Sequence, residues 1–195
     1  MQNLYIIAGC NGAGKTTASF TLLPKILNCN EFVNADEIAR GISPFNAESV
    51  SVEAGRIMIQ RIDGLLNEKK SFAVETTLSS RSYVKKIKGA ITQGYNVSLI
   101  FFWLPSEQQA IERVKSRVKE GGHNIPTYVV RRRYYAGLKN LFELYIPLCD
   151  HWLVFDNSTQ HPHIIAEGHH VETSYIYDDD TWGQIQKLSN HGKIT

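Results

Sequence analysis

Short apolar runs rich in β-branched and aromatic residues alternate along the chain with longer amphipathic stretches. Such alternation is typical of β/α units built around a mostly parallel sheet. The apolar runs predict five strands, at about 3–8, 31–34, 71–75, 97–103 and 152–156. The amphipathic stretches predict five helices, at about 15–27, 48–67, 80–93, 107–119 and 127–148. The pattern therefore predicts an α/β fold in which helices flank a mostly parallel, five-stranded sheet.

A glycine-rich segment, GCNGAGKTT, joins the first predicted strand to the first predicted helix. It matches the phosphate-binding pattern GxxxxGK[ST] at every fixed position, and its glycines let successive backbone amides surround a β-phosphate. Lys15 then reaches the β- and γ-phosphates, while the Thr16 hydroxyl binds Mg²⁺ at the positive end of the helix. The sequence therefore predicts a P-loop for a nucleoside triphosphate, formed by Gly9, Asn11, Gly12, Ala13, Gly14, Lys15, Thr16 and Thr17.

Two carboxylates follow the second and third predicted strands. Asp36 comes after the run FVNA, and Glu75 comes after the run SFAV. In this fold class, ligands bind outside the carboxyl ends of the strands, so both side chains are expected to face the nucleotide. We expect Asp36 to act as general base and Glu75 to bind the metal with Thr16 or to orient the acceptor. The alternative for Asp36 is a helix cap for the turn at 37–39.

Polar residues crowd the rim of the same predicted site. Four hydroxyl residues precede Arg81, namely Thr76, Thr77, Ser79 and Ser80. Hydroxyls with one arginine suit an anionic, oxygen-rich acceptor, but they also suit a polar loop that caps the next helix. Arg56 is a further candidate on the preceding helix, with a solvated helix face as its alternative. The residues expected to bind the acceptor are Asn34, Arg56, Glu75, Thr77 and Arg81.

Two groups of arginines flank a break between the fourth and fifth predicted helices. The break at 121–126 has glycines on one side and a proline on the other, so it can act as a hinge. Arginines near a hinge are typical of a lid that closes on phosphates. A solvated helix face has the same pattern, and we expect at least one of the three arginines at 131–133 to lie on such a face. We therefore expect a lid at about 113–133 in which some arginines contact phosphate, from among Arg113, Arg117, Arg131 and Arg132.

Composition narrows the class further. The chain has 195 residues, a length that fits one domain, 1–195. Its formal net charge of +2 is too small to indicate a nucleic-acid partner. It has no long apolar run for a membrane span, and its three cysteines form no metal-like pattern, so we expect a cytoplasmic protein. The core is expected at about 3–157. The tail, 158–195, has several histidines without metal-ligand spacing and is assigned no chemistry.

The motifs together favour a small-molecule kinase. No NKxD run for guanine and no LSGGQ signature are present, so ATP with Mg²⁺ is the expected cofactor. The motifs do not identify the molecule that accepts the phosphate. An antibiotic and a nucleoside are alternative acceptors for a kinase of this class. A different class is an ATP-dependent switch or binding module, which needs Mg²⁺ ligands but no base for a second substrate.

Residues 3–157 resemble the zeta toxin family of P-loop kinases in the order of the loop, the segments 34–36 and 75–77, and the arginine lid. The resemblance implies an adenylate-kinase-like fold and transfer of the γ-phosphate of ATP to the sugar 3′-hydroxyl of UDP-N-acetylglucosamine. It also implies an antitoxin partner.

The resemblance assigns roles to particular positions of this chain. It places the loop lysine at Lys15, the catalytic aspartate at Asp36 and the first lid arginine at Arg113. The strand-end glutamate and a nearby threonine fall on Glu75 and Thr77. The second lid arginine has no unique match, so its role passes to Arg117, Arg131 or Arg132. No residue at 54–58 matches the glutamate that reads the sugar's acetamido group.

The substitution Lys15→Ala is expected to abolish ATP binding or turnover, because it removes the charge that lies against the β- and γ-phosphates. The measurement is ATP affinity together with ATP turnover. Full affinity and turnover in this variant would contradict the P-loop assignment.

Overall fold

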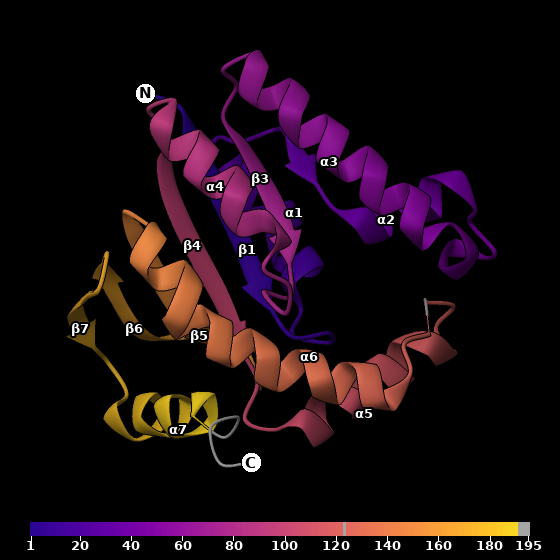
Figure 1. Ribbon diagram of the computed structural model, residues 1–195. Coiled ribbons are helices and arrows are strands. Elements are labelled where there is room, and N and C mark those ends of the chain that lie inside the picture. The colour runs from indigo at the N-terminus through magenta and orange to yellow at the C-terminus, as the bar shows by residue number, and fades with distance from the viewer. Residues whose placement is uncertain (123, 191–195) are drawn as a thin grey trace.

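The computed structural model describes residues 1–122 and 124–190. Its centre is a seven-stranded sheet with the order β2-β3-β1-β4-β5-β6-β7 (Figure 1). The first five strands in this order pair in parallel. They are β2 (Phe32–Val33), β3 (Phe72–Thr76), β1 (Asn3–Gly9), β4 (Asn96–Trp103) and β5 (His151–Asp156). The predicted α/β fold with a mostly parallel sheet is therefore confirmed.

The prediction of only five strands is wrong, because an antiparallel hairpin extends the sheet beyond β5. β6 (His163–His169) pairs with β5, and β7 (Glu172–Ile176) pairs with β6. All residues of β7 are exposed, so this strand lacks the alternation that identifies a half-buried strand in a sequence. The hairpin belongs to the expected tail, whose last residues, 191–195, lie outside the described part of the chain.

Helices cover both faces of the parallel strands. α1 (Lys15–Lys25) lies behind the sheet in Figure 1, whereas α4 (Ser82–Thr92) and α6 (Thr127–Asn140) cross its near face. Right-handed crossovers explain this division, since the chain runs in opposite directions along the sheet before and after β2. The other helices are α2 (Ala35–Ile42), α3 (Ser51–Asn67), α5 (Glu107–Lys119) and α7 (Asp179–Ser189).

Two predicted helices are less regular than their sequence pattern indicates. The one predicted at 48–67 begins with a 3₁₀ turn, η1 (Ala47–Val50), before α3 starts. The one predicted at 127–148 is α-helical only as α6 and continues as a π-helical turn, η2 (Leu141–Tyr145), and a 3₁₀ turn, η3 (Ile146–Leu148). Pro147 has no N–H for an α-helical hydrogen bond, which explains the irregular end. Among the described helices, none combines the length and the apolar character needed to cross a bilayer.

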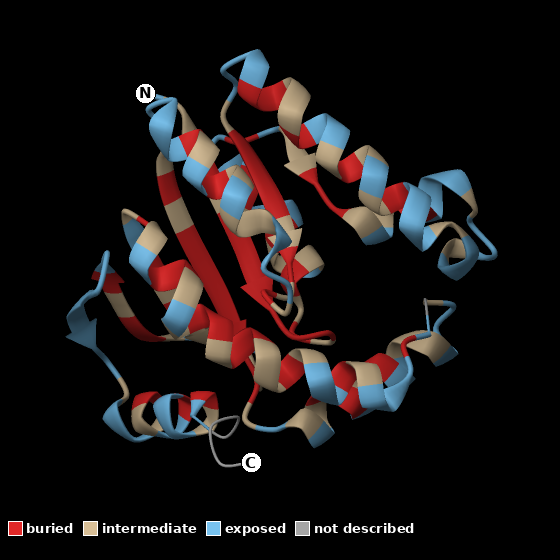
Figure 2. Cartoon of the chain, in the orientation of Figure 1, coloured by how far each residue is buried: buried red, intermediate tan, exposed pale blue. Residues whose placement is uncertain are grey.

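The apolar core surrounds the central strands β1 and β4, which are buried along most of their length (Figure 2). Strands covered on both faces read as continuous apolar runs, which is why the sequence pattern located them well. The hairpin and α7 join the same core. Trp182 of α7 stacks on Trp152 of β5 with ring centroids 5.6 Å apart, and Trp152 Nε1 donates a hydrogen bond to the His170 carbonyl.

The substitution Gly168→Ala is expected to lower the free energy of unfolding by about 2 kcal/mol, because a Cβ on β6 would overlap the Trp152 ring and the Glu172 carbonyl. Gly183→Ala is the matched control. Its Cβ would meet no atom within 4 Å on α7, so this variant should be as stable as wild type or up to about 1 kcal/mol more stable. Thermal or urea unfolding measures both. Unchanged stability in Gly168→Ala would contradict the packing of the hairpin on β5.

Candidate active site

The predicted P-loop connects β1 to α1 and is pressed against its neighbours. Gly12 and Gly14 have φ angles of 81° and 78°, which residues with a Cβ adopt only with strain. A Cβ on Gly12 would lie 2.8 Å from the Ala110 carbonyl oxygen of α5, and a Cβ on Gly14 would lie 2.5 Å from Asn157 Nδ2. Both glycines are therefore required by the backbone angles and by the close approach of other segments.

Lys15 is buried at the base of the loop. Its ammonium group donates a hydrogen bond of 2.9 Å to the Cys10 carbonyl and lies 3.7 Å from Glu75 Oε1. The charge is thus held beneath the loop, where a β- or γ-phosphate would lie in a P-loop protein.

Glu75 ends β3 within reach of three polar partners. Its Oε2 accepts hydrogen bonds of 2.8 Å from Thr16 Oγ1 and from Asn34 Nδ2. Burial raises the pKa of this carboxyl, while the Lys15 charge and the Thr16 hydrogen bond oppose the rise. A hydroxyl and a carboxylate in direct contact at the end of a P-loop form an oxygen-donor pair that fits Mg²⁺.

Asn34 joins the second strand to this cluster. Its Oδ1 accepts hydrogen bonds from the backbone N–H groups of Asp36, at 2.8 Å, and Glu37, at 3.4 Å, so Asn34 is the N-cap of α2. The alternative that Asp36 caps this helix is wrong. Because Asn34 also donates to Glu75, a single amide sets the start of α2 relative to the end of β3.

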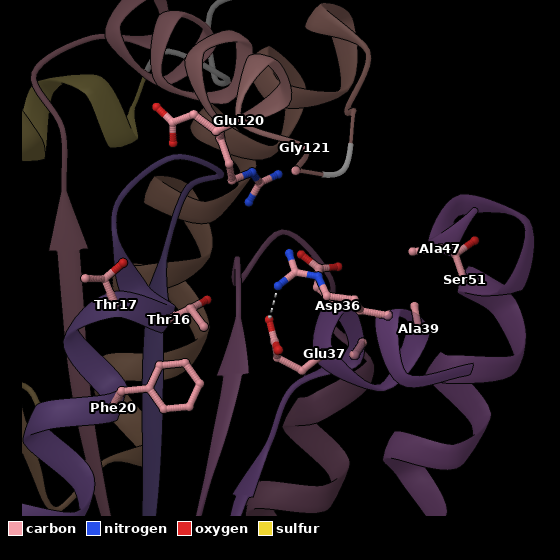
Figure 3. A pocket seen from close by; sticks show the side chains of 14 residues that line it. Thr16, Thr17, Phe20, Asp36, Glu37, Ala39, Ala47, Ser51, Glu120 and Gly121 are labelled. Atoms are coloured by element: carbon pink, nitrogen blue, oxygen red, sulfur yellow. Dashed lines mark hydrogen bonds and ion pairs between the residues drawn. The ribbon is translucent and has the colours of Figure 1, made fainter. Parts of the chain in front are cut away.

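Asp36 lies where two cavities meet. A cavity of about 240 Å³ extends from Lys15 and Glu75 to the loop after β3, and one of about 700 Å³ lies between α1, α2 and the end of α5. Figure 3 shows the larger one, with Thr16, Thr17 and Phe20 facing Asp36 and Glu37 across it. Asp36 lines both cavities.

The arginines expected in a lid occupy different environments. Arg113 donates hydrogen bonds of 2.8 and 2.7 Å to the carbonyl oxygens of Asn157 and Ser158. Arg117 lines the larger cavity beside Gly121 and Gly122. Arg131 is exposed and pairs with Glu107 at 2.7 Å, and Arg132 is exposed and lines neither cavity. The hinge predicted at 121–126 includes residue 123, which lies outside the described residues.

Arg133 is the arginine of the 131–133 run that reaches the P-loop. It donates a hydrogen bond of 3.3 Å to Asn11 Oδ1 and lines the smaller cavity with Asp36. Burial lowers its pKa, and the Asp36 charge opposes that change. The sequence pattern does not single out Arg133, because the side of a helix that faces the site depends on how the helix packs.

The expected acceptor residues are only partly brought together. Asn34, Glu75 and Thr77 line the smaller cavity. Arg56 and Arg81 are exposed and line neither cavity, so the structure does not bring their guanidinium groups to the site.

Asn157 is a site residue that sequence reasoning missed. It follows β5, and its Nδ2 donates a hydrogen bond of 2.6 Å to the P-loop carbonyl of Ala13. Arg113 in turn holds the Asn157 carbonyl, so α5, the end of β5 and the P-loop form one connected unit. The signal was available, because Asn157 directly follows a predicted parallel strand and ligands bind at such strand ends.

Comparison with known proteins is consistent with this geometry. A family model described as Zeta toxin matches residues 2–161. The chain belongs to the Zeta toxin family. An uncharacterized protein of Haemophilus influenzae is 32% identical over 135 residues, which cover 69% of this chain and 94% of the relative.

Two solved structures share the fold of this Zeta toxin family member. A chain of the AvrRxo1-ORF1:AvrRxo1-ORF2 complex with sulphate ions superposes with a TM-score of 0.75 and 18% identity over 97% of this chain. The match covers 64% of that chain, so the protein spans less than two thirds of it. A chain from the PezAT chromosomal toxin–antitoxin system of Streptococcus pneumoniae superposes with a TM-score of 0.64 and 15% identity, over 96% of this chain and 78% of that one.

Family membership and the P-loop architecture establish the enzyme class. The protein is a P-loop phosphotransferase, a kinase. The prediction of a P-loop kinase of the zeta toxin type is confirmed.

The substitution Asn157→Ala is expected to weaken ATP binding about tenfold, because it removes a hydrogen bond that holds the P-loop backbone. Asn190→Ala is the matched control, since it removes one amide–carbonyl hydrogen bond at the C-cap of α7, away from the loop. ATP affinity measured by calorimetry, with melting temperature to verify folding, compares the two. Equal ATP affinities would show that Asn157 does not position the loop.

Proposed function

We propose that the enzyme transfers the γ-phosphate of ATP to a hydroxyl of a small acceptor bound in the smaller cavity. The observation that carries this proposal is the position of Asp36, which lines both cavities beside the P-loop cluster. A carboxylate that faces a second-substrate cavity has a use in phosphoryl transfer to an acceptor. It has none in a nucleotide switch, which needs only metal ligands.

In the proposed reaction, Asp36 accepts the proton of the acceptor hydroxyl while the oxygen of that hydroxyl forms a bond to the γ-phosphorus. The bond between the γ-phosphorus and the bridging oxygen breaks, and ADP leaves with the electron pair. Lys15 and Arg133 supply positive charge near the P-loop, where phosphate charge shifts during transfer. Thr16 and Glu75 would hold Mg²⁺, which supplies charge neutralisation of the phosphates when bound.

The arginines differ in the roles that we propose for them. Arg133 borders the cavity where transfer would occur, and Arg117 lines the larger cavity at the end of α5. Arg113 is bound to two carbonyl oxygens, so we assign it to bracing the P-loop through Asn157 in this conformation. We retain Arg131 and Arg132 as candidates for contact with phosphate only after a lid movement, because their side chains are exposed here.

UDP-N-acetylglucosamine is the first acceptor to test, because it is the substrate that the zeta toxin resemblance implies. Antibiotics and nucleosides are the alternatives within the same enzyme class. We also propose a protein partner that acts as an antitoxin, because one solved relative is described as a toxin–antitoxin system. The cytoplasm, which has ATP and keeps thiols reduced, suits the three buried free cysteines.

The substitution Asp36→Asn is expected to leave ATP affinity nearly intact and to lower phosphoryl transfer by roughly 10²- to 10⁴-fold, the usual contribution of a positioned base. Asp180→Asn, on the exposed start of α7, is the control and should transfer phosphate at the wild-type rate. The measurement is ATP affinity alongside transfer to a panel of acceptors that includes UDP-N-acetylglucosamine. Unchanged transfer in Asp36→Asn would remove the base from the mechanism and favour the switch.

A further inference from the structure

Asn34 lies beside Glu75 because of the register between two strands. β2 and β3 pair in parallel with Val33 opposite Val74, so the next residues, Asn34 and Glu75, stand at the same level of the sheet. Asn34 keeps extended backbone angles, with φ −135° and ψ 120°, before α2 begins. Side chains at one level of a parallel pair point to the same face. Asn34 is therefore buried against the site, with 5% of its surface exposed.

The hydrogen bonds around the Asn34 amide allow it one orientation. Its Oδ1 accepts from the backbone N–H groups of Asp36 and Glu37, and its Nδ2 donates to Glu75 Oε2 at 2.8 Å. Turning the amide over would set its NH₂ group against two N–H donors and its oxygen against a carboxylate. Both ends of the amide are thus engaged by protein groups.

The helix that bears Asp36 depends on this cap. Of the residues of α2, Ala39 alone is buried, so burial of apolar surface stabilises the helix little. The N–H groups of a first helical turn have no partner within the helix, and Asn34 supplies one. One of the two N–H groups that it binds belongs to Asp36 itself, at 2.8 Å. Asn34 therefore holds the backbone from which the proposed base extends.

The other end of the amide holds the proposed metal carboxylate. Glu75 Oε2 accepts hydrogen bonds from both Asn34 and the Thr16 hydroxyl. Groups that bond to a metal-binding carboxylate orient it. Burial raises the pKa of Glu75, and the charges of Asp36 and Glu37 add to that rise. A neutral amide links these carboxylates without adding a further negative charge.

Capping alone does not explain an asparagine at this position. Serine and aspartate cap helices about as well as asparagine does. Aspartate has no N–H to donate to Glu75, and serine has one short hydroxyl in place of the two ends of an amide. Only the link to Glu75 uses the part of Asn34 that a cap does not require.

We propose that Asn34 is a positioning residue that holds Asp36 through its oxygen and Glu75 through its nitrogen. The single amide keeps the proposed base and the proposed metal carboxylate at a fixed separation. The inference rests on the proposed kinase function, in which these two carboxylates have those roles. Loss of the oxygen releases the start of α2, and loss of the nitrogen releases Glu75.

Two substitutions separate positioning from capping. Asn34→Ala removes both ends of the amide and should lower the melting temperature and reduce kcat at least about tenfold. Asn34→Ser keeps a cap, so it should restore the melting temperature to near wild type, while kcat stays at least about tenfold low because the link to Glu75 is missing. The measurements are thermal unfolding and transfer to the acceptor that the wild-type enzyme phosphorylates best.

A binding measurement tests the metal side without turnover. In EDTA, Asn34→Ser should bind a non-hydrolysable ATP analogue within about threefold of wild type, because Lys15 and the loop amides remain. The Mg²⁺ concentration that gives half of the Mg²⁺-dependent change in analogue affinity should rise about tenfold in this variant. Calorimetry over a series of Mg²⁺ concentrations measures both quantities.

Asp178→Ala is the matched control for the loss of a helix cap. Asp178 caps α7, where its Oδ1 accepts a hydrogen bond of 3.0 Å from the Thr181 backbone N–H. This variant should lower the melting temperature, as Asn34→Ala does, yet keep the kcat and the Mg²⁺ dependence of the wild type. An equal loss of kcat in Asp178→Ala would show that destabilisation alone explains the effect, which would overturn the inference.

The outcomes separate this inference from the kinase proposal. Wild-type kcat and Mg²⁺ dependence in Asn34→Ser would overturn the positioning role and leave the kinase proposal standing. Weak analogue binding by Asn34→Ser in EDTA would also overturn it, because Asn34 would then support the P-loop. If the wild-type enzyme phosphorylates no acceptor, the part that concerns Asp36 fails with the proposed function. The Mg²⁺ series then still decides the part that concerns Glu75.

Discussion

The buried carboxylate of Glu75 is the charge on which the site depends. Removing a carboxylate from water is costly unless other groups compensate it, and here Lys15, Thr16 and Asn34 do so. These partners come from the start of α1 and from the end of β2, so the cluster links three neighbouring parallel strands at their carboxyl ends. The loss of one partner would leave the buried charge less compensated, and it would also release the P-loop or the start of α2.

The opposite flank of the P-loop is braced by α5 and by the end of β5. α5 packs on Gly12, and the Asn157 amide binds the Ala13 carbonyl from the end of β5. Arg113 secures Asn157 through its carbonyl group. Because α5 is attached to the loop at this point, the lid that we propose would have to move beyond Arg113, where Arg117 and the glycines at 121–122 line the larger cavity.

The side of the smaller cavity away from the P-loop is lined by hydroxyl groups of the loop after β3, in which Leu78 has a strained φ angle of 55°. α6 and η2 hold the strained loop after β3 through Asn140 and Tyr145. The same run of helix positions Arg133 over the P-loop. One helical segment thus holds both the loop after β3 and Arg133, the cation that contacts the P-loop.

Local chemistry explains what the sequence alone determined. The P-loop, the five parallel strands and the strand-end positions of Asp36 and Glu75 follow from glycine spacing, apolar runs and the rule that ligands bind at strand ends. The outer hairpin escaped prediction because β7 is exposed on both faces and has no alternating pattern.

Tertiary structure decided which polar groups meet. The arginines at 131–133 are the same residue type at adjacent positions. Successive helical positions differ by about 100° in direction, so the packing of α6 decides that Arg133 reaches Asn11. The double role of Asn34, the bracing by Asn157 and the placement of Arg81 away from the cavity have the same origin. Each depends on contacts between segments far apart in the chain, and such contacts leave no periodic signal in the sequence.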